Sequence, residues 1–73
     1  MDEITLKHQQ KVILTFLRDY LEGATRLQIA RGTGIERATI CRRVAELRER
    51  GLLHVHHEGL DPITNTKAEF LAL

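Results

Sequence analysis

Apolar residues repeat at helical spacing in the first third of the chain and predict a helix over residues 6–22. The stripe consists of Leu6, Ile13, Phe16, Leu17 and Tyr20. Gly23 follows in the position where helices often end. Val12, Leu14 and Leu21 widen the stripe beyond what one small core needs, so we expect a homodimer that forms through this helix.

A second, shorter helix is predicted over residues 26–32. Thr25 precedes it and is a favourable N-cap, because its hydroxyl can accept from a free amide of the first turn. Gly32 and Gly34 then permit the positive φ values of a tight turn, and Ile35 is expected to enter the core beside it.

The third predicted helix covers residues 36–50 and ends before a glycine. At 100° per residue, Ile40, Val44 and Leu47 form one stripe, which we expect to be buried. Arg42 points away from that stripe and marks the outer face of the helix.

The pattern changes to alternation at "LLHVHHE", where Leu53 and Val55 alternate with histidines and predict a strand over residues 52–57. Residues 59–66 favour turns. Residues 66–73 can be read in two ways: as a helix capped by Thr66, or as a strand with Ala68, Phe70 and Ala72 on one face. The strand is favoured because the first strand needs a partner.

The order is therefore helix, helix, tight turn, helix, strand, loop, strand. This order predicts one α+β domain over residues 1–73, with the architecture of a winged helix-turn-helix: three helices followed by a β-hairpin wing.

The distribution of charge along the chain is more informative about binding partners than the net charge of +1. Residues 26–50 contain seven arginines and three glutamates, a net charge of +4, whereas the segments before and after are acidic. A local basic face attracts polyanions even when the whole molecule is nearly neutral.

Residues 24–53, "ATRLQIARGTGIERATICRRVAELRERGLL", resemble the winged helix-turn-helix repressor superfamily. The shared features are the Thr-capped short helix, "IARGTGI", and a polar-rich helix that ends in "LRERGLL". "DPITNTKAEF" is similar to the wing of small phage-encoded winged-helix proteins, with Asn65 in place of a glycine. The resemblance implies binding to double-stranded DNA, with helix 36–50 in the major groove.

Carried over position by position, the resemblance places five residues of the third helix in the groove: Arg37, Ala38, Thr39, Arg42 and Arg43. Arg42 can offer a bidentate fork to guanine, and Ala38 and Thr39 can meet a thymine methyl. Arg37 and Arg43 are expected at phosphates. Thr25 and Arg26 would present a further phosphate site at the start of the second helix.

Two features depart from the family pattern. Glu36 stands at a helix start where Ser is more usual, and its carboxylate could repel phosphate or accept from cytosine. The wing lacks arginine and offers His54, His56, His57 and Lys67 instead, so His56 and Lys67 are the expected wing contacts. Such contacts should strengthen as the histidines become charged.

The three wing histidines also raise the possibility of a metal site. In a regular strand His54 and His56 share one face and His57 points to the other, so no set of converging ligands is expected and no metal is predicted. Cys41, near three arginines, is interpreted as a half-buried helix-edge residue rather than a redox switch.

Other classes of function find little support. The chain has no serine, no glycine-rich phosphate loop and no suitably spaced carboxylate pair, so we expect neither an enzyme nor a cofactor. No apolar run is long enough to span a membrane, and the single cysteine fits a cytoplasmic protein. We expect a transcriptional regulator of the repressor type. The alternatives are a winged-helix protein-interaction module, or an accessory protein of phage replication or excision.

Overall fold

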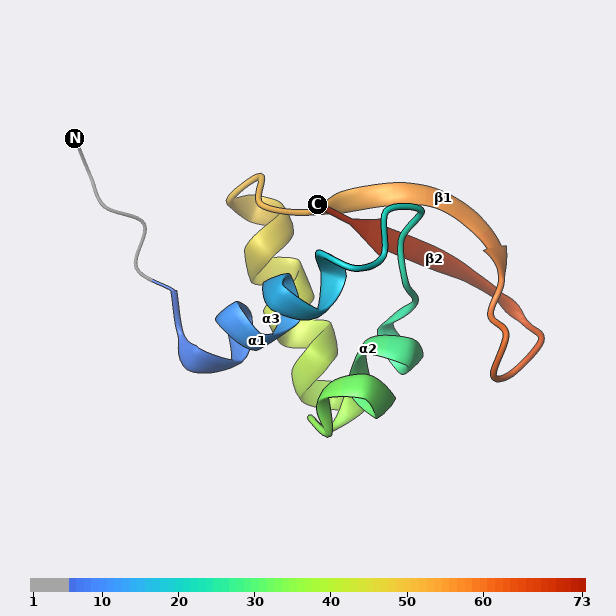
Figure 1. Cartoon of the computed structure of the whole chain (residues 1–73), viewed down its shortest axis with the longest axis horizontal. Coiled ribbons are helices and arrows are strands. Elements are labelled where there is room, and N and C mark those ends of the chain that lie inside the picture. Colours follow the sequence, from blue (N-terminus) through green and yellow to red (C-terminus); the bar gives the residue numbers. More distant parts are fainter. Residues whose placement is uncertain (1–5) are drawn as a thin grey trace.

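The computed structural model describes residues 6–73, which form three helices followed by two strands (Figure 1). The elements are α1 (His8–Leu17), α2 (Arg26–Thr33), α3 (Arg37–Glu49), β1 (His54–Leu60) and β2 (Lys67–Ala72). The strands pair antiparallel as a long hairpin, whose loop lies at the opposite end of the molecule from the start of α1. This α+β layout is consistent with a winged helix and confirms the predicted order of elements.

α1 is shorter than predicted. It ends at Leu17, after which the amide of Tyr20 donates to the Leu17 carbonyl and the amide of Gly23 donates to the Tyr20 carbonyl. Gly23 has a φ of +96°, and a Cβ there would lie 3.0 Å from the carbonyl oxygen of Leu71. The expectation that Gly23 ends the helix is therefore wrong, because this glycine instead lets the chain pass closely along β2.

α2 begins as predicted. The Thr25 hydroxyl accepts from the Gln28 amide at 3.1 Å, and the Gln28 side chain accepts from the Thr25 amide at 2.9 Å. Gly34 ends the helix with a φ of +76°. Gly32, which was expected in the turn, lies within α2 instead. A side chain does not fit at this position, because the ring of Phe16 occupies the space that a Cβ would fill.

The core lies where the three helices meet the base of the hairpin. The α3 stripe is fully buried, as predicted. It packs with Ile13 and Leu17 of α1, Ile29 of α2 and the buried residues Leu53 and Leu71. One face of α3 is therefore fixed inside the molecule, and this orientation determines which side chains the helix presents to solvent.

The hairpin contains an irregularity that the sequence did not predict. β1 starts later and runs further than the expected strand, whereas β2 confirms the strand interpretation of the C-terminal segment. Val55 pairs with Leu71 and His57 pairs with Phe70, so His56 is an extra residue in a β-bulge. The expected strict alternation of the histidines is therefore wrong. The rings of His56 and His57 contact each other, with centroids 5.0 Å apart.

Candidate nucleic-acid interface

The outer face of α3 centres on Arg42, which has the small side chains of Ala38 and Ala45 beside it. Its exposed residues are Arg37, Ala38, Cys41, Arg42, Ala45, Arg48 and Glu49. Ala38 and Ala45 lie one turn before and one turn after Arg42 on this face. Arg42 is exposed and has no ion-pair partner among residues 6–73. Thr39 is half-buried at one edge of this face.

Arg43 is placed differently from Arg42. Its guanidinium donates to both carboxylate oxygens of Glu46, at 2.8 and 3.1 Å, and its side chain is only 14% exposed. Glu46 also accepts from the Gln10 side chain of α1 at 2.8 Å. The resemblance predicts a phosphate contact for Arg43. In the structure, its ion pair with Glu46 belongs to the contact between α3 and α1.

The two residues expected at a phosphate at the start of α2 also make contacts within the protein. Thr25 is 1% exposed, and its hydroxyl caps the helix. The guanidinium of Arg26 donates to the Glu69 carboxylate of β2 at 2.9 Å. Arg26 can reach a phosphate only if it leaves or shares Glu69, and the buried Thr25 side chain positions the helix rather than facing a ligand.

The two expected wing residues are both exposed but lie in different surroundings. The Lys67 ammonium pairs with Glu58 at 3.1 Å across the strands. The Nδ1 atoms of His56 and His57 lie 2.8 Å apart, and the His57 ring stacks on Phe70 with centroids 4.5 Å apart. One of these nitrogens must carry the proton of the shared hydrogen bond and the other must accept it.

Two candidate functional residues were not predicted from the sequence. Arg48 is exposed and lies on the same edge of α3 as Arg37 and Cys41, as its spacing of eleven residues from Arg37 could have indicated. Asp61 is buried in the wing loop, and only its position before Pro62 in a turn-forming stretch hinted at a structural role.

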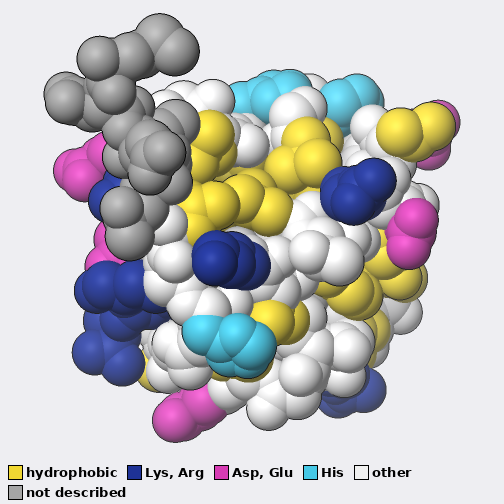
Figure 2. All heavy atoms as spheres, turned by 60° about the vertical axis from the view of Figure 1, so that its left-hand side comes forward, with side chains coloured by type: hydrophobic (Ala, Val, Ile, Leu, Met, Phe, Trp, Pro, Cys, Tyr) yellow, Lys and Arg dark blue, Asp and Glu magenta, His cyan; other side chains and the backbone are white. Residues whose placement is uncertain are grey.

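The surface charge is unevenly distributed. On the face shown in Figure 2, the largest group of Lys and Arg side chains lies at the lower left edge, others lie singly in the middle and at the right, and apolar side chains gather in the upper middle. The α3 face contributes Arg37, Arg42 and Arg48 against the carboxylate of Glu49, while Arg26, Arg43 and Lys67 form ion pairs with carboxylates elsewhere. The unpaired positive charge of the predicted site is thus concentrated on α3.

The described part of the chain was expected to hold neither a metal site nor a membrane-spanning helix. Residues 6–73 contain no group of three or more His, Cys, Asp or Glu side chains placed to hold a metal ion. No helix within this range is long and apolar enough to cross a bilayer. Cys41, expected to be half-buried, is exposed because it lies on the outer face of α3.

Comparisons of the chain with protein-family models, with curated proteins and with solved structures find no match.

Proposed function

We propose that this protein binds double-stranded DNA, with α3 in the major groove. The observation that carries the proposal is the position of Arg42, which is exposed between Ala38 and Ala45 on the side of α3 opposite its buried stripe. The major groove of B-DNA, about 12 Å wide, admits a helix that presents such a face. The class proposed is the winged helix-turn-helix, acting in the cytoplasm as a transcriptional regulator of the repressor type.

The residues have separate roles in this proposal. Arg42 donates a bidentate pair to guanine O6 and N7, and the methyl groups of Ala38 and Thr39 meet thymine methyls. Arg37 and Arg48 lie at the edge of the same face, where they reach phosphates on one side of the groove. His56, exposed on the wing, adds a contact to the neighbouring backbone.

The ion pairs of the structure narrow the set of contacts. Arg43 is committed to Glu46 and is removed from the interface. Arg26 and Lys67 contribute only when a phosphate competes with their carboxylate partners. We therefore expect few phosphate contacts and a modest dependence of affinity on salt, about one unit of logarithmic slope for each phosphate neutralised.

Selection of bound duplexes from a random pool tests the proposal. Selection at two salt concentrations should yield a common sequence motif that contains a guanine, and the affinity should fall as salt increases. A pool that shows no enrichment, together with no salt-sensitive binding to any duplex, would contradict DNA binding.

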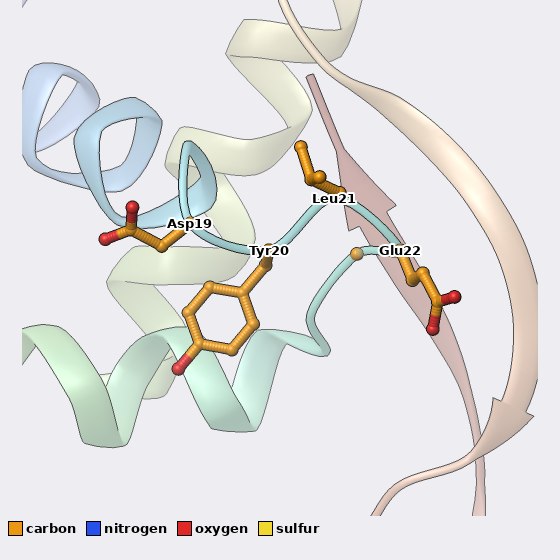
Figure 3. Close-up of a pocket in the computed structure, with 5 residues that line it drawn as sticks. Asp19, Tyr20, Leu21 and Glu22 are labelled. Carbon is orange, nitrogen blue, oxygen red and sulfur yellow. The ribbon is translucent and has the colours of Figure 1, made fainter.

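The competing function, a protein-interaction module, is favoured by the turn after α1. Leu21 is 87% exposed, beside Tyr20 at the rim of a shallow hollow between Asp19 and Gly23 (Figure 3). The Tyr20 ring is directed toward α2, whereas Leu21 points to the other side of the turn. This position differs from the predicted one, because Leu21 does not belong to α1.

The homodimer is proposed through this turn and the neighbouring face of α1. Leu14 is packed against the core and is only partly available, which leaves Leu21 as the main exposed apolar side chain there. Sedimentation equilibrium should show a dimer that Leu21→Asp converts to a monomer, while the Arg18→Ala control leaves it unchanged. A monomer at every concentration, with and without duplex, would contradict dimerisation, and a stable complex with a different protein that L21D abolishes would favour the interaction module.

A further inference from the structure

The β-bulge brings the rings of two wing histidines together. A regular strand directs neighbouring side chains to opposite faces, and the expected divergence of His56 and His57 followed from that alternation. At the bulge two residues of β1 oppose one residue of β2, so the alternation is interrupted between Val55 and His57. The Nδ1 atoms of the two histidines lie 2.8 Å apart, and both side chains are exposed. Two potential ligands of a metal ion therefore converge where the sequence predicted that they would diverge.

The His57 ring is held in a defined orientation by its neighbours. It stacks on Phe70 of β2, with ring centroids 4.5 Å apart and planes inclined by 9°. A Cβ at Gly59 would lie 3.5 Å from Cδ2 and 3.6 Å from Nε2 of this ring. These two atoms form the edge of the ring opposite Nδ1, so Nδ1 is directed away from Gly59 and toward His56. Packing thus preorganises one of the two ligands, and the exposed His56 side chain can adjust to it.

The separation of the two nitrogens fits neighbouring positions around a metal ion of square or tetragonal geometry. Imidazole nitrogens lie about 2.0–2.1 Å from a first-row divalent ion, so two of them at a right angle are about 2.8–3.0 Å apart. At the tetrahedral angle that Zn²⁺ prefers, the two nitrogens are about 3.3–3.4 Å apart. The observed 2.8 Å corresponds to the first arrangement, which is typical of Cu²⁺ and Ni²⁺.

We propose that His56 and His57 chelate a divalent ion of tetragonal preference, Cu²⁺ or Ni²⁺, through their Nδ1 atoms. Without the ion, one Nδ1 carries the proton that the other accepts. When the ion binds, that ring carries its proton on Nε2 instead, so both Nδ1 lone pairs become available. Water or another oxygen ligand takes the remaining positions, because residues 6–73 provide no third His, Cys, Asp or Glu ligand here and Glu58 pairs with Lys67. This site goes beyond the proposed DNA binding and does not depend on it.

Calorimetric titration of the full chain with Ni²⁺ alone tests the site. The wild type should bind one equivalent of the ion. His56→Ala and His57→Ala should each lower the affinity about tenfold or more, because each variant converts a chelate into a single ligand. His8→Ala on α1 and His54→Ala at the start of β1 remove exposed histidines outside the pair and serve as matched controls. Equal affinities of the wild type and H56A, or an equal loss in H54A, overturn the proposal.

Spectroscopy with Cu²⁺ locates the ion while both histidines are present. The exposed thiol is first removed by Cys41→Ser, because Cu²⁺ oxidises thiols. With less than one equivalent of Cu²⁺, the amide signals of residues 55–58 and of Phe70 should broaden before those of α1 and α2. The electron paramagnetic resonance spectrum should be axial, with coupling to two imidazole nitrogens. Broadening that begins elsewhere, or coupling to one imidazole only, overturns the proposal. A protein that binds the ion in this way but binds no duplex keeps the metal site and loses the proposed function, so the two failures are distinguishable.

Discussion

The guanidinium of Arg43 is bound within the protein, 2.8 and 3.1 Å from the carboxylate oxygens of Glu46, one turn further along α3. Glu46 also accepts from the buried Gln10 side chain, whose own oxygen caps the start of α1 by accepting from the Lys7 amide at 2.8 Å. The Nε of Arg43 has no hydrogen-bond partner within residues 6–73. Two adjacent arginines of α3 thus have different roles, since Arg42 faces solvent and Arg43 joins two helices.

Arg43→Ala should therefore act on stability rather than on DNA affinity. The variant loses charge-assisted hydrogen bonds and the packing of the arginine stem, so the free energy of unfolding should fall by about 1–3 kcal/mol. Urea unfolding measures this change. Under conditions in which the variant is fully folded, the slope of the logarithm of DNA affinity against the logarithm of salt concentration should match that of the wild type. A slope reduced by one unit would show that Arg43 contacts phosphate after all.

Arg42→Ala should produce the opposite pattern. Because Arg42 is exposed and has no ion-pair partner in the described part of the chain, its removal should change stability by less than about 0.5 kcal/mol. Discrimination for guanine at one position of the selected motif should fall by about 1–3 kcal/mol. Binding titrations with single-base variants of the duplex measure this loss. Arg18→Ala, on the turn after α1, is the matched control, and equal losses in both variants would argue against base recognition by Arg42.

The local parts of the site could be predicted from sequence, and the long-range parts could not. Helical spacing alone placed Ile40 and Arg42 on opposite faces of α3, and the cap at Thr25 followed from its place before a helical segment. The contact of Arg43 with α1 depends on Glu46, which also accepts from Gln10. Gln10 lies 36 positions before Glu46, and no local pattern connects these two residues.

The wing was the least predictable element for the same reason. A β-bulge is a property of two paired strands, so the sequence of one strand gave no sign that His56 would be the extra residue. The burial of Asp61 depends on the approach of the wing loop to Thr25, which belongs to a distant part of the chain. Such contacts arise only when the elements pack together.

Gly32, within α2, and Gly34, at the end of that helix, should respond differently to substitution by alanine. In Gly32→Ala the new Cβ meets the ring of Phe16, and overpacking of this kind typically costs about 1–3 kcal/mol. Gly34→Ala has open space, but its positive φ costs about 1–2 kcal/mol. Phe16→Leu should therefore rescue the first variant and not the second in thermal unfolding. Equal rescue of both would contradict the proposed contact between Phe16 and Gly32.

The stability of the fold should depend on the ionisation of Asp61 in acid. Burial raises the pKa of this carboxylate, hydrogen bonds from the Thr25 side chain and from the amides of Ile63 and Thr64 lower it, and the net effect is a lowering. The pKa in the folded protein therefore lies below the ordinary value of 3.8, so the folded state binds the proton less tightly than the unfolded state does. The resulting stabilisation is fully present above the unfolded-state pKa and is lost as the pH falls through the lower folded-state pKa. The difference in unfolding free energy between wild type and D61N should therefore be greatest near neutral pH and shrink in acid. Urea unfolding from pH 7 to pH 2, with D19N as control, measures this difference, and a constant difference across the range would show that the charge of Asp61 does not stabilise the wing.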